Sequence, residues 1–234
     1  MKNVVSRTIC TAACFCLCIG FLLISVDFVA LNKSFYLNEF HANDSAETVG
    51  ISDADLNAVT TQLIKYLSGQ SNTIQVNVTF YGSSKATVFY GTDELDHMRD
   101  AKTVFVAARI LGYTLFGVGA VVLIVLAILM RKKFVKPFAF GAAVGSAIFL
   151  CIGIILGIII AADFNGAFVA FHKIFFPKGN WEFPESSAMI RMLPESLFTN
   201  AAAIILASAA VFSVLLCGIG TFFLIRNRNK KVTV

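Results

Sequence analysis

Four long runs of apolar residues alternate with polar segments along the chain. They lie near 8–31, 103–130, 138–162 and 199–225. Each run is long enough to cross the hydrocarbon core of a bilayer, which is about 30 Å thick and needs roughly 20 helical residues. The pattern therefore predicts a mainly α-helical membrane protein with a bundle of four transmembrane helices. In the third run, small residues at multiples of four would let neighbouring helices approach closely: Gly141, Gly145, Gly153 and Gly157.

Between the first two runs, over residues 32–102, the pattern changes. An apolar stripe at helical spacing predicts a helix that ends near Ser68 and is capped by Ser52 or Asp53. Apolar and polar residues then alternate over 74–80, which predicts a half-buried strand, and the next apolar run can pair back with it as a hairpin. We expect this segment to form a small extracytoplasmic α+β cap on the bundle.

The second membrane helix is predicted to begin well before its apolar run, at Thr92. Acidic residues in the first turn complement the helix dipole, and nothing interrupts the pattern through Met130. His97 lies on this extension, and Asp93 and Asp100 can share its helix face because they are four residues before it and three after. An imidazole flanked by carboxylates is therefore expected just outside the membrane.

The segment 163–198, between the third and fourth runs, is too polar to span a bilayer and unusually aromatic. It carries His172 and the chain's single tryptophan, Trp181. One helical face near its start repeats phenylalanine at steps of four, three and four: Phe164, Phe168, Phe171 and Phe175. Such a face suits a short helix lying in the headgroup region, with His172 beside it. We therefore expect a functional site to lie at the membrane surface.

The distribution of charge predicts the orientation. Ten basic residues, with no acidic residue among them, lie in the N-terminal segment, in the 131–137 loop and after the fourth run. All 14 acidic residues lie on or near the other side. Because loops rich in Lys and Arg stay in the cytoplasm, both termini and the 131–137 loop are expected there. The chain then divides into 1–31 (N-terminus and first span), 32–102 (cap), 103–162 (second and third spans), 163–198 (interfacial loop) and 199–234 (fourth span and tail).

Composition agrees with a membrane protein. The chain is 57% hydrophobic and only 14% charged, which is unlike a soluble core. Its net charge of +5 is interpreted as a topology signal with some attraction to anionic lipid, and no nucleic-acid partner is expected. All six cysteines lie in predicted spans, so no disulfide-stapled external domain is expected and the cysteines are interpreted as small packing residues.

Two of the three histidines are candidates for chemistry. The topology brings His97 and His172 to the same membrane face, whereas His41 lies in a polar loop and is interpreted as structural. An imidazole titrates near pH 6.5 and can both take and give a proton at neutral pH. The pair could therefore serve as base and acid for a lipid-borne substrate.

Charged residues near the outer ends of the spans leave two interpretations open. Asp27, Arg109 and Asp163 either include a structural Arg–Asp pair, or Arg109 binds a carbonyl or oxyanion in a half-buried site. The sequence contains no nucleophile elbow, metalloprotease helix or phosphate-binding loop. From the residues alone, a phospholipid or peptidoglycan-precursor transferase and a non-enzymatic four-span scaffold stay open, although such scaffolds normally carry external cysteine pairs.

Two motifs resemble a known family. One is His97-Met98-x-Asp100-x-Lys102, and the other is Phe171-His172-Lys173-Ile174-Phe175-Phe176…Gly179-Asn180-Trp181-x-Phe183, followed by Pro194-Glu195-x-Leu197-Phe198. In these motifs, and in the number and orientation of its spans, the chain resembles the lipoprotein intramolecular transacylases of Gram-positive bacteria. The resemblance covers nearly the whole chain.

The resemblance implies a defined reaction. Family members move the sn-2 acyl chain of a lipoprotein's diacylglyceryl-cysteine to the α-amine of the same cysteine, which leaves a lyso-form N-acyl lipoprotein. The family's paired catalytic histidines fall on His97 and His172. The residues then expected to support the site or bind substrate are Asp100, Arg109, Asn180, Trp181, Phe168 and Phe171.

The chemistry of this reaction requires few catalytic groups. Conversion of an ester to an amide is downhill, so no cofactor and no metal ion is expected. Because amine and ester belong to one molecule, orienting them can supply roughly 7–11 kcal/mol of the barrier. Two histidines and a cation or backbone donor then suffice for proton transfer and oxyanion binding. We expect a monomer in the bacterial plasma membrane, with the bilayer and a diacylated lipoprotein substrate as its partners.

Overall fold

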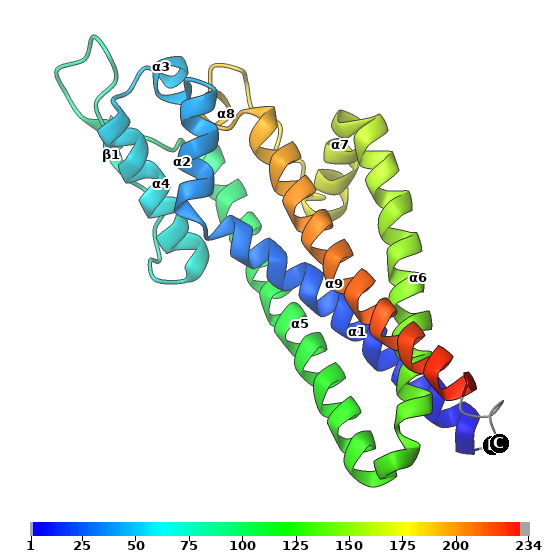
Figure 1. The fold of residues 1–234 in the computed structure, drawn as a ribbon. Coiled ribbons are helices and arrows are strands. Elements are labelled where there is room, and N and C mark those ends of the chain that lie inside the picture. Colours follow the sequence, from blue (N-terminus) through cyan, green and yellow to red (C-terminus); the bar gives the residue numbers. More distant parts are fainter. Residues whose placement is uncertain (1, 230–234) are drawn as a thin grey trace. The chain divides into compact units, whose positions relative to one another are not determined.

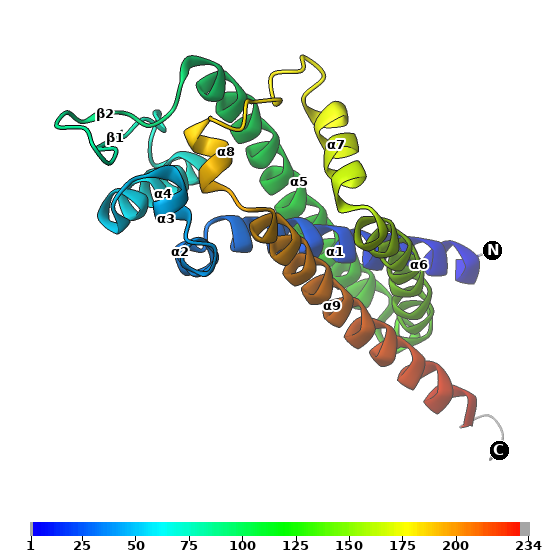
Figure 2. The same cartoon turned by 90° about the horizontal axis from the view of Figure 1, so that it is seen from above.

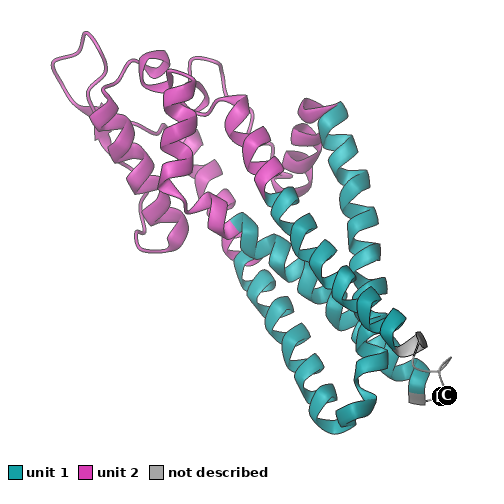
Figure 3. Cartoon of the chain, in the orientation of Figure 1, with its two compact units in different colours: residues 1–26, 108–162, 205–234 teal, residues 27–107, 163–204 magenta. Residues whose placement is uncertain are grey.

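The structure is a computed structural model that describes residues 2–229, with side chains from Asn3 to Arg226. Lys230 and Lys231, which belong to the predicted basic tail, lie outside the described residues. The chain forms two compact units, coloured in Figure 3. Unit 1 comprises residues 1–26, 108–162 and 205–234, and unit 2 comprises residues 27–107 and 163–204.

Four helices in the described part of the chain are long and apolar enough to cross a membrane, as predicted. They are α1 (Lys2–Ala30), α5 (Thr92–Met130), α6 (Val135–Ala162) and α9 (Glu195–Asn229), all visible in Figure 1. The predicted continuous helix from Thr92 to Met130 is confirmed. At 39 residues it is about twice as long as a bilayer requires, so its polar first turns extend beyond the apolar run.

Close backbone approaches hold the helices of unit 1 together, with α1 at the centre. A Cβ added to Gly141 of α6 would lie 2.5 Å from the backbone of Cys10, and one added to Gly145 would lie 2.7 Å from the carbonyl oxygen of Thr11. On the other side of α1, Gly20 meets the backbone of Phe116 of α5 in the same way, at 2.6 Å. Small residues therefore set the helix spacing, as the sequence pattern suggested.

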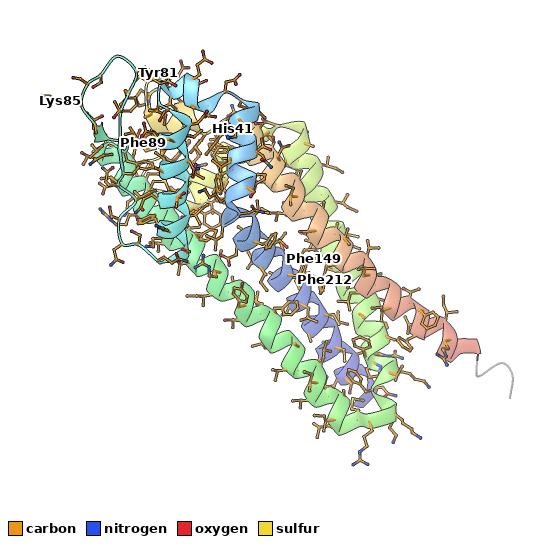
Figure 4. All side chains as sticks on the ribbon, turned by 60° about the vertical axis from the view of Figure 1, so that its left-hand side comes forward. His41, Tyr81, Lys85, Phe89, Phe149 and Phe212 are labelled. Carbon is orange, nitrogen blue, oxygen red and sulfur yellow. The ribbon has the colours of Figure 1, made fainter. Side chains whose placement is uncertain are left out.

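The prediction that all four glycines of α6 serve this purpose is wrong for two of them. A Cβ added to Gly153 or Gly157 meets no atom within 4 Å. Aromatic rings fill the next level of the bundle instead: Phe149 packs edge-on against Phe15 at 6.3 Å, and the rings of Phe21 and Phe212 stack at 4.4 Å. Figure 4 labels Phe149 and Phe212 among these helices. The bundle thus changes along its length from glycine contacts to ring contacts.

The outer faces of these helices are apolar. Exposed side chains include Ile124, Ile128, Ile154 and Ile158. Apolar patches of this extent are unusual on a soluble protein and are expected where lipid covers them. The spans are therefore membrane helices by surface as well as by length.

A short 3₁₀ turn, η1 (Arg131–Lys133), separates α5 from α6 within the predicted 131–137 loop. The helix α6 begins at Val135, three residues earlier than expected, with Pro137 inside its first turn. Proline is tolerated there because amides of the first turn have no partner within the helix. The proline therefore did not delay the start of the helix.

Unit 2 contains the segment predicted as an α+β cap. The predicted helix is confirmed as α4 (Asp53–Ser68), and the side chain of Ser52 caps it by accepting the Asp55 amide at 3.1 Å. The predicted hairpin is also present but short, with β1 (Asn77–Val78) antiparallel to β2 (Thr87–Val88). Tyr81 and Lys85 lie on the loop between the strands in Figure 4.

Two helices of unit 2 were not predicted, α2 (Lys33–Ala42) and α3 (Ser45–Val49), which Figure 2 shows beside α4. His41 lies near the end of α2, so its placement in a polar loop was wrong. Asn32 caps α2 by accepting the Phe35 amide at 3.2 Å, and the apolar side of the helix is buried through Phe40. Only two residues of α2 are buried, so its amphipathic signal in the sequence is weak.

The remaining elements of unit 2 are the last turn of α1, α7 (Phe164–Phe175), α8 (Ala188–Met192) and the first turns of α5 and α9. One hydrophobic core joins α2, α3, α4, the hairpin, α8 and the start of α9; its most buried members include Phe40, Ile51, Leu56, Tyr90 and Met192. The start of α5 packs against this core through Leu95 and Met98. The core therefore gives the polar first turns of α5 a fixed support.

A polar cluster also fixes the start of α9 to α2. The carboxylate of Glu39 accepts hydrogen bonds from Ser196 at 3.1 Å and from Asn200 at 2.8 Å. The side-chain amide of Asn43 donates to Ser196 at 2.9 Å. These bonds hold the first turns of α9 in a defined place beside α2.

Candidate active site

The first turns of α5 present His97 and Asp100 on one helix face. Glu94 caps this end, because its buried carboxylate accepts the Gly91 amide at 2.8 Å. The hydroxyl of Ser187, just before α8, donates to the other oxygen of the same carboxylate. The cap therefore ties the start of α5 to the chain just before α8.

The second histidine is carried by α7, whose bounds are set by local chemistry. Asp163 caps its start by accepting the Gly166 amide at 2.8 Å. The helix ends at Phe175, shortly before Pro177, because a proline disfavours helical backbone in the residue before it. Gly179 then adopts a φ of +76°, a left-handed conformation that suits glycine, and the chain reverses. This reversal returns Asn180 and Trp181 toward the helix they have just left.

The two candidate imidazoles lie together inside unit 2. The ring centroids of His97 and His172 are 6.1 Å apart, and their planes differ by 24°. Phe176 packs against both rings, at 4.8 Å from His97 and 5.4 Å from His172. Phe183 covers His97 at 5.6 Å, and Trp181 covers His172 at 4.9 Å. The pair therefore sits in an aromatic enclosure built from α5, α7 and the returning chain.

The phenylalanine stripe of α7 divides into two faces. Phe168 points inward, with its ring 4.0 Å from that of His172 and 5.5 Å from that of Phe198. Phe171 also touches His172, at 5.5 Å, but it is 46% exposed, and Ile174 and Phe175 beside it are exposed as well. His172, at 9% exposure, is thus part of the inward face rather than beside the stripe.

The hydrogen bonding of His172 defines its tautomer. Its Nδ1 lies 2.8 Å from the carbonyl oxygen of Phe168, which can only accept, so Nδ1 carries a proton. Burial lowers the pKa of His172 below its ordinary value of 6.5, against a smaller opposite effect of the Phe168 carbonyl. The ring is therefore neutral at pH 7, and its lone pair is on Nε2. That nitrogen is free of the helix backbone and can act as a base.

Asp100 and Asn180 form a second polar feature. The side-chain amide of Asn180 donates to Asp100 Oδ2 at 3.0 Å, and the Lys178 ammonium lies 3.6 Å from the same oxygen. Asn180 Oδ1 is buried without a hydrogen-bond partner, and so is His97 Nδ1. These are the two buried side-chain nitrogen or oxygen atoms left unpaired among residues 3–226. Leaving such an atom unpaired costs about 1–3 kcal/mol, so two of them in one site indicate polar atoms kept for a ligand.

Most sequence-predicted site residues therefore converge in unit 2: His97, Asp100, Phe168, Phe171, His172, Asn180 and Trp181. Arg109 belongs to unit 1 and stays a sequence-based candidate. His41 lies on α2, with its ring 3.9 Å from Asp53. Of the charged residues near the span ends, Asp163 serves as a helix cap, and Asp27 is buried. Within the described residues, no group of three or more His, Cys, Asp or Glu side chains could hold a metal ion.

Three residues of the site were missed by sequence reasoning. Phe176 follows Phe168 and His172 at steps of four residues, so the helical spacing in the sequence already indicates that it shares their inward face. Phe183 stands two residues after Trp181 in the quoted motif. Glu94 is one of the acidic residues that the sequence pattern predicts only to complement the helix dipole, whereas its link to Ser187 joins positions 93 residues apart. No local pattern reports such a link.

Four membrane helices and an enclosed pair of imidazoles define the class of protein, a polytopic membrane protein with two histidines packed together among aromatic rings. The family described as lipoprotein intramolecular transacylase Lit matches residues 11–198. The chain belongs to this family, and it is therefore a membrane-integral acyltransferase that acts on lipoproteins.

Solved structures agree in fold. The chain resembles the lipoprotein intramolecular transacylase Lit from Bacillus cereus with a TM-score of 0.74 and 21% identity, covering 96% of this chain and 98% of that one. A variant of that protein with a histidine replaced by arginine matches with a TM-score of 0.73 and 21% identity, over 98% of this chain and 96% of that one. A second variant, with alanine in place of histidine, has the same score and identity over 97% of both chains. Among curated protein sequences, none matches.

Proposed function

We propose that this chain moves the sn-2 acyl group of a diacylglyceryl-cysteine to the α-amine of that cysteine, with His97 and His172 as the proton-transfer groups. The observation that carries the proposal is the pair of imidazoles 6.1 Å apart in an aromatic enclosure. No cysteine is available as a nucleophile for either ring, since all six cysteines lie in the membrane runs. Direct attack by the substrate's own amine needs no protein nucleophile.

The proton balance of this reaction explains why two imidazoles are useful. The free α-amine is largely an ammonium at neutral pH, because its pKa is about 7.7–8.0. It carries three protons, whereas the amide product carries one. Two protons must therefore leave the nitrogen, one before the amine can attack and one as the new carbon–nitrogen bond forms. One of them ends on the sn-2 oxygen when the ester bond breaks, and the other goes to water.

His172 is the better candidate for the base that acts as the bond forms. Its Nδ1 proton is engaged by the Phe168 carbonyl, so Nε2 presents the lone pair in a fixed direction. We assign the first deprotonation, which turns the ammonium into an attacking amine, to His97. The imidazolium formed there then returns its proton to the leaving sn-2 oxygen. Each step uses an imidazole that starts neutral and ends neutral.

The tetrahedral oxyanion also needs a donor. Arg109 is the cation that the sequence offers for this role, and preorganised donors of this kind are worth about 10²–10³ in rate. Its assignment rests on the sequence alone.

The two faces of α7 suggest how the substrate reaches the histidines. Phe171, Ile174 and Phe175 form an exposed apolar face that suits contact with lipid acyl chains, and Phe168 on the inward face touches His172. An acyl chain lying along α7 would therefore bring its ester toward the imidazoles. The excess of basic residues in the opposite loops supports an extracytoplasmic location for this site.

Mass spectrometry of a defined substrate tests the proposal. A synthetic diacylglyceryl-cysteine lipopeptide with a saturated chain at sn-1 and an unsaturated chain at sn-2 is incubated with the chain in lipid nanodiscs. We expect the unsaturated chain on nitrogen and the saturated chain left on glycerol. A mixture of isotope-labelled and unlabelled peptides should give no crossed products. Transfer from added phospholipid, or crossed products, would instead indicate a transferase with a second substrate site.

A further inference from the structure

The unpaired oxygen of Asn180 is the starting point. It is buried, yet no donor of the described residues reaches it. The second unpaired buried atom, His97 Nδ1, belongs to the imidazole that is one helical turn before Asp100, the partner of Asn180. Trp181, the neighbour of Asn180 in sequence, lies over the His172 ring at 4.9 Å. Asn180 is therefore linked to both histidines indirectly, through Asp100 on the helix of His97 and through its neighbour Trp181 to His172.

Asp100 determines which way the Asn180 amide faces. An ionised carboxylate can only accept hydrogen bonds, so the amide must turn its NH₂ group toward Asp100, where the distance is 3.0 Å. The Lys178 ammonium lies 3.6 Å from the same carboxylate oxygen, so the carboxylate has a second donor beside the Asn180 amide. The amide oxygen is then necessarily directed away from Asp100. The arrangement presents an acceptor, not a donor, to whatever occupies the site.

We propose that Asn180 Oδ1 accepts a hydrogen bond from the α-amine of the substrate cysteine and, with His97 Nδ1 and His172 Nε2, forms a three-acceptor site for a primary ammonium. The proposal rests on the proposed function and adds a substrate-positioning residue to it. An ammonium on a carbon has three N–H bonds, and the site offers three acceptors. Two of the acceptors can take a proton, whereas an amide oxygen cannot.

This difference determines which hydrogens leave the nitrogen and which one stays. The protons directed at the two imidazoles leave the nitrogen, one ending on the sn-2 oxygen and one in water. The hydrogen held by Asn180 Oδ1 is the one that stays on the amide product. Asn180 thus orients the amine's lone pair, once it is released, without competing for its proton. Asp100 acts through Asn180 as a positioning residue.

The site therefore selects for a free primary amine, and binding of a non-reacting analogue can measure this. The probes are two dialkyl-ether lipopeptides, in which ethers replace both esters so that no transfer occurs. One carries cysteine with its free α-amine, and the other carries a deamino residue that lacks the amine and adds no bulk. We expect the chain in nanodiscs to bind the amine probe about tenfold or more tightly than the deamino probe, because hydrogen bonds to a charged group are strong.

The decisive comparison uses Asn180→Leu. The variant should bind the deamino probe as the unchanged chain does, which also shows that it is folded, and its preference for the amine should fall at least threefold. Asp100→Asn should lose part of the preference too, because the Asn180 amide is then no longer held in one orientation. His41→Asn, with a change on the surface of α2, should retain the full preference.

Two results would overturn the proposal. One is an Asn180→Leu variant that keeps the full amine preference, and the other is a variant that loses affinity for both probes equally, which would make Asn180 structural. Either result leaves the proposed function untouched, provided the unchanged chain still makes the N-acyl lyso product from the ester substrate. If that product never forms, the proposed function fails by itself.

Discussion

Replacing His172 by Asn separates catalysis from packing. The asparagine NH₂ group can take over the hydrogen bond to the Phe168 carbonyl, which the Nδ1 of His172 makes at 2.8 Å. The side chain is smaller than imidazole and has no basic nitrogen. It should therefore keep the end of α7 in place while removing the proton-transfer group.

The expected magnitudes differ for rate and stability. Loss of a general acid–base group lowers the rate by about 10²–10⁴, which corresponds to about 2.7–5.4 kcal/mol of barrier. Loss of the ring contacts with Phe168, Phe176 and Trp181 should cost about 0.5–3 kcal/mol of stability, as most single changes do. The variant should therefore stay folded and lose nearly all of its activity.

The assay compares initial rates of N-acyl product formation with thermal unfolding in the same detergent. His41→Asn is the matched control, because that side chain is 59% exposed and pairs only at 3.9 Å with Asp53. Its removal should change stability by no more than about 1 kcal/mol and leave the rate unchanged. A His172→Asn variant whose rate stays within tenfold of the unchanged chain would refute direct proton transfer by His172.

The pH dependence follows from the direction of the His172 shift. Burial lowers the pKa of His172, so the lone pair on Nε2 is retained as the pH falls to 6.5 and is lost only at lower pH. The acid limb of kcat/KM for the unchanged chain should therefore lie below 6.5. The unfolded chain takes up this proton at the ordinary pKa, so stability should also fall as the pH drops below about 6.5. His172→Asn should lose that component of the stability profile.

Three further predictions concern packing, the lipid face and topology. Gly141→Ala should lower the melting temperature, because its Cβ would lie 2.5 Å from the Cys10 backbone and overpacking of this kind costs about 1–3 kcal/mol. Gly153→Ala should not lower it, because no atom lies within 4 Å of the added Cβ. Equal melting temperatures of the two variants would contradict the close approach of α1 and α6. Phe171→Asp, at a residue 46% exposed, should reduce activity in nanodiscs with little change in melting temperature, and intact activity would remove the lipid-facing role of α7. A reporter inserted at Ser83 should be extracytoplasmic and one at the C-terminus cytoplasmic; a cytoplasmic reporter at Ser83 would reverse the orientation.

The sequence by itself determined the membrane helices and the longer local elements. Mean hydropathy identified the four spans because a helix in lipid must satisfy its own backbone, which leaves a long apolar run as an unmistakable signal. The cap of α4 at Ser52 was also predictable because it depends on residues within one turn, and the continuous helix from Thr92 was predictable because nothing interrupts its pattern. Short elements were not predicted, because α2 has only two buried residues and α3 spans only five, which are too few for a periodic pattern.

Only the tertiary structure decided how the candidate site is assembled. Sequence spacing placed Phe168 and Phe171 on one face of α7, yet the packed chain turns Phe168 inward to His172 and leaves Phe171 exposed. The sequence could name His97 and His172, but it could not place the proton of His172 on Nδ1, because that depends on how the ring is turned toward the Phe168 carbonyl. The bond between Asn180 and Asp100 joins residues 80 positions apart. Periodicity reports neighbours along one element, whereas an acceptor's direction depends on contacts between distant segments, and these exist only once the chain has packed.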